Sequence, residues 1–212
     1  MKKIITENSV FIYPLVVVWL FLAYILLAFT KGQIHLFINQ YYSGFFDVFF
    51  KLYTNVGNGL VPVVLVIIFL FVSLRKALII GVATALAGIV AQIFKRFIFY
   101  DQPRPKLFFQ DIADLHMVPG VELYTHHSFP SGHTATAFSM FFVLAFYTKS
   151  KLLKVICLIS AALVAYSRMY LSQHFLCDVY FGSLFGFFSG IVTVWFFEGI
   201  KNDKIDLPLF KK

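Results

Sequence analysis

Residues 129–148 read FPSGHTATAFSMFFVLAFYT, a short polar stretch at the start of a long apolar run. Pro130 ends a loop, and the run after it predicts a helix buried in a membrane. The first backbone N–H groups of a helix are unpaired, and Gly132 leaves them unobstructed, so the stretch suits an anion. Taken alone, the same pattern also describes an ordinary helix start with an incidental histidine at His133.

A second polar stretch, SRMYLSQHFLCD at 167–178, follows another apolar run. His174 and Asp178 are four residues apart and share one face of a predicted helix. A carboxylate there can accept a hydrogen bond from one imidazole nitrogen and leave the other as a nucleophile or base. The pair is equally consistent with a structural contact that closes a helix end. An acidic residue near the edge of a bilayer is costly, however, which favours a functional role.

The composition is that of an integral membrane protein. Of the 212 residues, 60% are hydrophobic and 13% are charged, and the mean hydropathy is +0.83. A soluble domain carries about 25% charged residues, so this chain has too little polar surface for a water-soluble globule. A net charge of +8 can indicate a nucleic-acid partner. Here the basic residues cluster at the ends of apolar runs, so we expect a lipid bilayer and no nucleic acid.

Six apolar runs predict an all-α bundle of six transmembrane helices, which we expect to form a single domain over residues 1–212. Segment 32–56 is too polar to span, and its near-helical apolar spacing predicts a helix in the membrane interface or one packed on the bundle. The longest polar connection, 99–131, has a length that is usually functional or disordered. The predicted spans are 10–29, 58–74, 77–98, 132–148, 152–170 and 175–197.

Lysine and arginine are unevenly divided between the two ends of the six predicted helices. One end holds 11 of the 18 basic residues: Lys2, Lys3, Arg75, Lys76, Lys149, Lys151, Lys154, Lys201, Lys204, Lys211 and Lys212. The other end holds the remaining 7: Lys31, Lys51, Lys95, Arg96, Arg104, Lys106 and Arg168. The positive-inside rule places the first set and both termini in the cytoplasm. We therefore expect an inner (cytoplasmic) membrane protein with both polar stretches on its extracytoplasmic side.

Two arginines belong to the same predicted face of the membrane. An arginine binds phosphate oxygens through a planar fork and stays charged. Arg104 lies between Pro103 and Pro105, which restrict its backbone. Arg168 ends the fifth predicted helix, six residues before His174. The alternatives are a solvated loop charge for Arg104 and an interfacial anchor for Arg168.

The predicted topology gathers two arginines, two histidines, an aspartate, Ser131 and Gly132 on one side of the membrane. Together they offer cationic donors for a dianion, a carboxylate-oriented nucleophile in His174, and an acid in His133. Phosphoryl transfer needs mainly positioning and charge stabilisation. The combination therefore predicts an enzyme that acts on a phosphate group.

These stretches resemble the signature of the type 2 phosphatidic acid phosphatase superfamily, which also includes vanadium haloperoxidases and some bacterial acid phosphatases. The family pattern is Lys-x6-Arg-Pro, Pro-Ser-Gly-His and Ser-Arg-x5-His-x3-Asp. The second part is present unchanged at 130–133 and the third at 167–178. The six-helix layout resembles the membrane branch of the superfamily, so the resemblance covers most of the chain.

The first part of the family pattern is altered. Arg104 is followed by proline, but Phe97 stands where the pattern has lysine. Lys95 and Arg96 lie slightly further upstream, and Lys106 lies just downstream. We expect Lys95 to supply the missing cation, with Arg96 and Lys106 as the alternatives.

The resemblance also implies a mechanism. His174 would attack phosphorus and form a phosphohistidine, with Asp178 orienting it, and His133 would protonate the leaving oxygen. Water would then release phosphate. No metal or other cofactor is implied, and the 10 acidic residues form no cluster that suits Mg²⁺. The substrate phosphate would be held by Arg104, Arg168, Ser131, Gly132 and Lys95.

The leading hypothesis is a metal-independent membrane phosphatase that hydrolyses a lipid phosphate or pyrophosphate through a phosphohistidine. The candidate substrates are undecaprenyl pyrophosphate, phosphatidylglycerol phosphate, phosphatidic acid and the phosphates of lipid A. A lipid phosphotransferase would use the same residues with another acceptor. A membrane transporter would place its polar residues near the bilayer midplane, whereas these lie at helix ends. The sequence indicates no particular protein partner.

Overall fold

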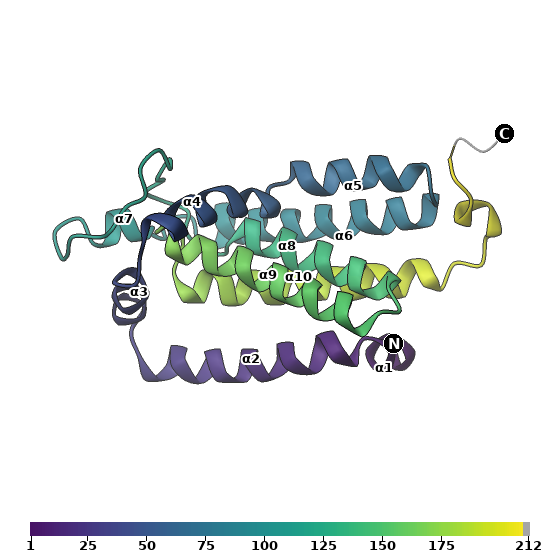
Figure 1. Ribbon diagram of the computed structural model, residues 1–212, viewed down its shortest axis with the longest axis horizontal. Helices are drawn as coiled ribbons and strands as arrows, with labels where there is room; N and C mark the ends of the chain where they lie inside the picture. Colours follow the sequence, from purple (N-terminus) through teal and green to yellow (C-terminus); the bar gives the residue numbers. More distant parts are fainter. Residues whose placement is uncertain (210–212) are drawn as a thin grey trace.

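The computed structural model describes residues 1–209, and within them the chain is all-helical, with no strand. The long helices lie side by side along one axis (Figure 1). All six apolar runs form helices: α2 (Ser9–Ala28), α5 (Leu60–Leu70), α6 (Leu74–Ile93), α8 (Gly132–Tyr147), α9 (Lys151–Tyr170) and α10 (Leu176–Glu198). The shorter elements between and beside them are α1 (Lys2–Glu7), α7 (Pro105–Phe108) and the 3-10 turn η3 (Asp203–Asp206).

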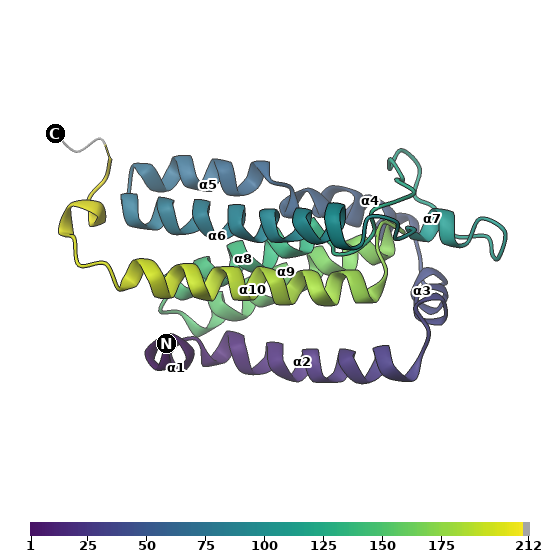
Figure 2. The ribbon, with the colours of Figure 1, turned by 180° about the vertical axis from the view of Figure 1, so that it is seen from behind.

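The two ends of the bundle differ. The N-terminus and the last described residues lie at one end, and the 99–131 connection with α7 lies at the other (Figures 1 and 2). This arrangement agrees with the predicted separation of the termini from the polar loop. Lys211 and Lys212, which the sequence assigns to the end with the termini, lie outside the described residues.

Four helices are long and apolar enough to cross a membrane: α2, α6 with the turn after it, α9 and α10. They have 20 to 25 residues, close to the ~20 that a span requires. Helix α5 has only 11 residues and is bent by 53° from the preceding segment, with which it forms a fifth candidate span. Helix α8 has 16 residues. The six predicted helices are therefore confirmed, but their number as complete spans is not.

Helix α8 lies at the centre of the bundle and packs against α6, α9 and α10. Nine of its 16 residues are buried, and most of these are apolar, as expected of a helix with neighbours on several sides. Phe138 and Phe142 on α8 share a buried cluster with Ile79 and Ile80 of α6 and Phe187 of α10. The start of α8, which carries the histidine of the first polar stretch, is thereby fixed between its neighbours.

Glycines allow α10 to approach α8 closely. Gly182 and Gly186 lie one helical turn apart on the face of α10 that meets α8. A side-chain carbon on Gly182 would lie 2.7 Å from the backbone oxygen of Ser131, and one on Gly186 would lie still closer to that of Ala135. Small residues at four-residue spacing are a common basis for close helix packing in membranes.

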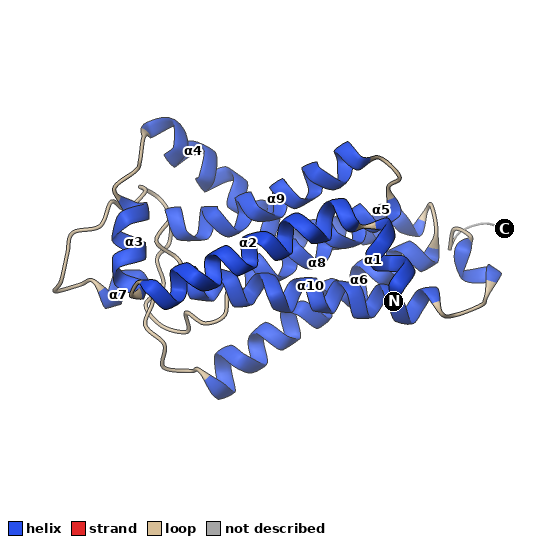
Figure 3. Ribbon diagram, turned by 90° about the horizontal axis from the view of Figure 1, so that it is seen from below, coloured by secondary structure: helices blue, strands red, loops and turns tan. Residues whose placement is uncertain are grey.

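Segment 32–56 forms two helices, α3 (Lys31–Asn39) and α4 (Gly44–Tyr53), followed by the 3-10 turn η1 (Thr54–Gly57). Helix α3 runs across the loop end of the bundle, crosswise to α2 (Figure 3). Helix α4 leads through η1 into α5. The predicted single helix is thus a pair, and only α3 has the crosswise orientation of an interfacial segment.

A buried histidine docks α3 on the rest of the molecule. The His35 ring is 1% exposed and packs against Phe109 and Phe175. Its Nε2 lies 3.2 Å from the hydroxyl oxygen of Ser172. Burial lowers the pKa of His35 to about 4, so the ring is neutral near pH 7. Helix α3 is therefore fastened directly to the turn between α9 and α10.

Candidate active site

The turn between α9 and α10 has a defined backbone. Ser172 adopts a left-handed conformation with φ of 51°, which ends α9. The backbone N–H groups of Gln173 and His174 both donate to the carbonyl oxygen of Arg168, at 2.9 and 3.1 Å. This closed turn places His174 two residues before the first residue of α10.

His174 and Asp178 contact each other, as their four-residue spacing predicts. Each is 2% exposed, and His174 Nδ1 lies 3.3 Å from Asp178 Oδ2. The same carboxylate oxygen accepts from Ser128 Oγ at 2.5 Å and from the Phe175 backbone N–H at 2.9 Å. In the tautomer that donates Nδ1–H to this carboxylate, the imidazole keeps its lone pair on Nε2.

The start of α8 lies against the same part of α10. The Ser131 backbone N–H donates to the carbonyl oxygen of Asp178 at 3.0 Å. Ser131 Oγ accepts from the Thr134 backbone N–H at 3.4 Å and from Thr134 Oγ1 at 2.9 Å, so it caps the helix. A side-chain carbon on Gly132 would have no protein atom within 4 Å. The space beside the first turn of α8 is therefore open at Gly132.

Arg104 joins the polar loop to the turn between α9 and α10. Its Nε donates to the His126 carbonyl at 3.0 Å, and its Nη1 donates to the backbone and side-chain oxygens of Gln173 at 3.0 and 3.1 Å. Nη2 makes only a long contact, 3.4 Å, with the His127 carbonyl. Arg104 is thus neither a solvated loop charge nor wholly free, because most of its donors are used by the protein.

Arg168 is 8% exposed and lies at the end of α9. Its Nη1 donates to Thr54 Oγ1 at 2.7 Å, but its buried Nε has no partner among the described residues. An unpaired buried donor on a cation is costly unless a ligand satisfies it. Because the Arg168 side chain is buried and bonded to Thr54, it does not extend from the surface as an interfacial anchor would.

The surroundings of His174 keep it neutral. Burial lowers the pKa of His174 well below its ordinary value, and the positive charges of Arg104, Lys95 and Arg168 lower it further. Arg104 belongs to the first motif, Arg168 belongs to the third, and Lys95 lies just before the position where the first motif has its lysine. Lys95 is thus close enough to lower the pKa of the imidazole. The altered spacing of the first motif did not show which residue takes the place of the missing lysine.

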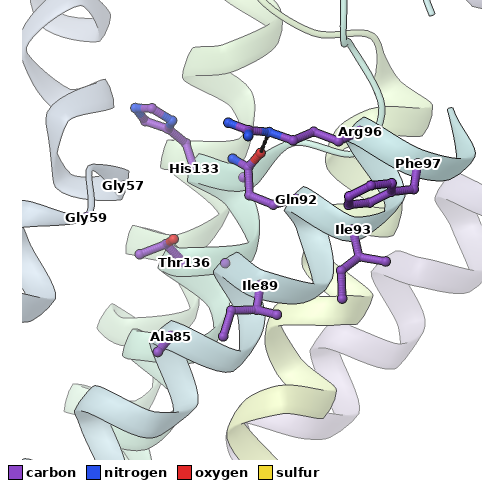
Figure 4. Close-up of a pocket in the computed structure, with 12 residues that line it drawn as sticks. Gly57, Gly59, Ala85, Ile89, Gln92, Ile93, Arg96, Phe97, His133 and Thr136 are labelled. Carbon is purple, nitrogen blue, oxygen red and sulfur yellow. Dashed lines mark hydrogen bonds between the residues drawn. The ribbon is translucent and has the colours of Figure 1, made fainter. Parts of the chain in front are cut away.

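The other two candidate cations lie elsewhere. Lys106 is exposed on α7. Arg96 lines a cavity of about 700 Å³, together with Gly132 and His133 (Figure 4). His133 thus lies at the start of α8, next to Ser131 and Gly132, and beside a cavity that extends along α6.

Several residues that support the site had no clear signal in the sequence. Ser128 lies just before the second motif, and Gln173 lies inside the unspecified part of the third. Thr54 meets Arg168 across 114 residues, so only the fold reveals the pair. Tyr124 lies 5.4 Å from the guanidinium of Arg104 in a cation–π contact.

The helical membrane fold, with a buried imidazole–carboxylate pair among cations, defines a membrane-bound phosphatase. The family model of the PAP2 superfamily matches residues 76–201, a range that holds all three motifs and more than half of the chain. The chain belongs to the PAP2 superfamily.

Two solved structures have the same fold. LpxE from Aquifex aeolicus matches with a TM-score of 0.68 and 29% identity, over 77% of this chain and 93% of that chain. A transmembrane PAP2 type phosphatidylglycerolphosphate phosphatase from Bacillus subtilis matches with a TM-score of 0.67 and 23% identity, over 93% of this chain and 98% of that chain. The comparison with curated protein sequences found no match. As a member of this superfamily with the fold of these membrane enzymes, the chain is a lipid phosphatase.

Proposed function

We propose that this chain, as one catalytic domain over residues 1–212, hydrolyses a lipid phosphate or pyrophosphate through a phosphohistidine on His174. The observation that carries the proposal is the Ser128–Asp178–His174 chain of hydrogen bonds. It leaves Nε2 of a neutral imidazole unprotonated beside three cations. That is the arrangement a nucleophile needs to approach an anionic phosphate.

The chemistry follows from the placement of the two histidines. Nε2 of His174 attacks phosphorus, and the bond from phosphorus to the leaving oxygen breaks. His133, at the first turn of α8, gives that oxygen its proton. A water molecule then attacks the phosphohistidine, its proton returns to His133, and inorganic phosphate leaves.

The phosphate itself is held by a cationic and backbone cradle. The unpaired Nε of Arg168 supplies a donor without other use in the protein. The free space at Gly132 admits an oxygen to the backbone N–H groups of α8. Arg104, Lys95 and the Ser131 hydroxyl complete the cradle, with Arg104 releasing its long contact to the His127 carbonyl.

We propose that the reaction needs no metal. The charged side chains that lower the pKa of His174 are positive, and they would repel a divalent cation. Asp178 is the carboxylate at the centre, and its Oδ2 already accepts from three donors. These residues are suited to stabilise the charge of the phosphoryl group themselves.

The substrate is proposed to be a lipid because the cavity beside His133 is lined largely by apolar residues and glycines. A second cavity of about 480 Å³, between α5 and α6, shares Gly59, Ala85, Gly88 and Thr136 with it. An acyl or prenyl chain fits this furrow while its phosphate reaches the cradle. Undecaprenyl pyrophosphate, phosphatidylglycerol phosphate, phosphatidic acid and lipid A share this chemistry.

We further propose that the protein lies in the inner membrane with both termini in the cytoplasm. The site would then face the extracytoplasmic side, because it lies at the end of the bundle opposite the N-terminus (Figure 1). The uneven lysine and arginine distribution supports this orientation.

The proposal is tested with purified protein in EDTA on a panel of lipid phosphates, beside His174→Ala and His133→Ala. We expect phosphate release by the unmodified protein and a loss of at least about 10²-fold in each variant. Acid-labile, base-stable ³²P on the protein, present with His133→Ala and absent with His174→Ala, would identify the intermediate. Undiminished release by both variants would contradict the mechanism, and loss of activity in EDTA would contradict its independence from metals.

A further inference from the structure

Two consecutive cations, Lys95 and Arg96, differ in their surroundings. They lie in the π-helical turn η2 (Phe94–Ile98), where the Phe99 backbone N–H bonds the Phe94 carbonyl at 2.8 Å. Successive residues of a helix are rotated by about 100°, so neighbours face different surroundings. Lys95 acts on His174, whereas Arg96 lines the cavity beside His133. A π turn inside an α-helix is often found at functional sites.

Arg96 provides the charge of that cavity. Among the described residues that line it, Arg96 alone carries a permanent charge, and Gln92 is its only amide. The rest of the lining is apolar, glycine or a single threonine, apart from His133. A charge at the polar end of an otherwise apolar furrow is placed to meet a headgroup rather than a hydrocarbon chain.

The guanidinium of Arg96 is oriented and unpaired. Its Nε donates to Gln92 Oε1 at 3.2 Å, one helical turn away. No ion pair joins it to any of the carboxylates whose side chains the structure describes. In Figure 4 the side chain extends past Gln92 in the direction of His133. The two Nη groups are therefore available to an anion, and the planar fork matches phosphate oxygens.

The position of His133 determines which part of a substrate Arg96 would meet. The transferred phosphoryl group lies on the side of His174, and the leaving oxygen lies at His133, under the proposed function on which this inference rests. Whatever continues from that oxygen into the cavity belongs to the leaving group. A cation there lowers the energy of a leaving group that is itself an anion.

We propose that Arg96, oriented by Gln92, binds a phosphate on the leaving-group side, so that the enzyme prefers lipid diphosphates to lipid monophosphates. With a diphosphate, the bond from the terminal phosphorus to the bridging oxygen breaks as the bond to His174 forms. The bridging oxygen leaves on a lipid monophosphate and takes the proton of His133. The negative charge that remains on that product lies at Arg96. With a monophosphate, the leaving group is a neutral alcohol and Arg96 has no partner.

The competing account is that Arg96 merely anchors the end of α6 among lipid headgroups. An anchor would affect every substrate to the same extent, because it would act on the fold or on membrane placement. A contact to the leaving phosphate would affect diphosphates alone. The ratio of the rate on a diphosphate to the rate on a monophosphate therefore distinguishes a leaving-phosphate contact from a membrane anchor.

The test compares kcat/KM for farnesyl diphosphate and farnesyl monophosphate, in detergent with EDTA, for the unmodified protein, Arg96→Gln and Gln92→Leu. Arg96→Gln should lower kcat/KM on the diphosphate about tenfold, the effect of one charge-assisted hydrogen bond. Its rate on the monophosphate should stay within about twofold, which also shows that the variant folds. Gln92→Leu should give a smaller loss in the same direction. Lys151→Gln, which removes an exposed charge at the opposite end of the bundle, is the control.

Equal changes on both lipids, or no change on either, would overturn the role of Arg96 while leaving the phosphatase proposal intact. A lower rate on the diphosphate than on the monophosphate in the unmodified protein would overturn the preference. Hydrolysis of neither farnesyl lipid by the unmodified protein would overturn the preference for diphosphates. It would overturn the proposed function as well only if the protein also released no phosphate from the panel of lipid phosphates.

Discussion

At the scale of single residues, Asp178 depends on a hydroxyl that the motif does not include. Ser128 donates to Asp178 Oδ2 at 2.5 Å, in a region where both groups are almost fully buried. This hydrogen bond and the one from the Phe175 N–H fix the carboxylate that orients His174. The imidazole of His174, the proposed nucleophile, is therefore positioned by the polar loop as well as by α10.

Ser128→Ala should lower kcat about tenfold, because a hydrogen bond to a buried charge contributes about 1.5–3 kcal/mol. The measurement is phosphate release from a saturating lipid phosphate. Ser139→Ala is the matched control, since Ser139 Oγ is buried on α8 without a partner among the described residues. Its loss should leave kcat unchanged. Equal rates for Ser128→Ala and the unmodified protein would show that Asp178 needs no support from the loop.

The protonation of His174 is the second residue-scale prediction. Burial lowers its pKa well below 6.5, and Arg104, Lys95 and Arg168 lower it further. The acid limb of the kcat/KM profile should therefore lie below pH 6.5, because the nucleophile is lost only when it is protonated. Lys95→Gln removes one repelling charge, so it should raise the pKa of His174 and move the acid limb to higher pH.

The same shift has a consequence for stability. Since the folded state resists protonation of His174 more than the unfolded state does, this contribution to stability is complete above about pH 6.5 and declines as the pH falls below that value.

The control for the acid limb of Lys95→Gln is Lys106→Gln, at an exposed position on α7. An acid limb that moves with Lys106→Gln and not with Lys95→Gln would assign the first-motif cation to Lys106.

At the scale of elements, the contact between α8 and α10 sets the site because each helix begins with part of it. The Ser131 N–H bonds the Asp178 carbonyl, and the glycines of α10 bring the two helix starts together. The hydrogen bond and the close approach of the glycines both involve backbone atoms of Ser131 and Ala135, which cannot move unless α8 moves. Close packing here is therefore a condition for the geometry of the two histidines.

Gly186→Ala should lower the free energy of unfolding by about 1–3 kcal/mol, because its new side-chain carbon would overlap the Ala135 carbonyl oxygen. The measurement is thermal unfolding of the detergent-solubilised protein. Gly88→Ala, the same substitution on α6, has no protein atom within 4 Å of the added carbon. It should leave stability unchanged or raise it by about 0.5–1 kcal/mol. Indistinguishable melting curves for the two variants would contradict this account of the helix contact.

At the scale of the whole molecule, local sequence patterns predicted the helices and the His174–Asp178 contact well. Apolar runs and four-residue spacing depend on neighbours in the chain, so both can be read without the fold. The 53° bend before α5 and the 16-residue length of α8 depend on packing. The Thr54–Arg168 contact, and the hydrogen bonds that occupy Arg104, join distant segments and have no local signature.

Some of the lysines and arginines on which the predicted membrane orientation depends have structural roles. At the end that holds the N-terminus, Lys154 is buried and bonds Asn8 Oδ1 at 2.5 Å. Arg75 bonds Asp206 and the Ile200 carbonyl, which fastens the segment after α10. These cations are held by protein partners, whereas several on the other end belong to the site. When the cations with protein partners and the cations of the candidate site are both left out of the count, the end with the termini still has more basic residues. The reason is that its exposed lysines remain.

That remaining bias predicts which end a membrane-impermeant reagent reaches. Ile112 is 67% exposed in the polar loop, and Leu152 is 69% exposed at the opposite end of the bundle. Ile112→Cys should react with an impermeant maleimide in intact cells, and Leu152→Cys should react only after the membrane is permeabilised. The unmodified protein measures the background from Cys157 and Cys177, which are partly buried. Because each variant is compared in intact and in permeabilised cells, a gain in labelling on permeabilisation reports the membrane barrier rather than burial of the cysteine. The reverse pattern would place the site in the cytoplasm, and the lysines near the termini would then need another cause.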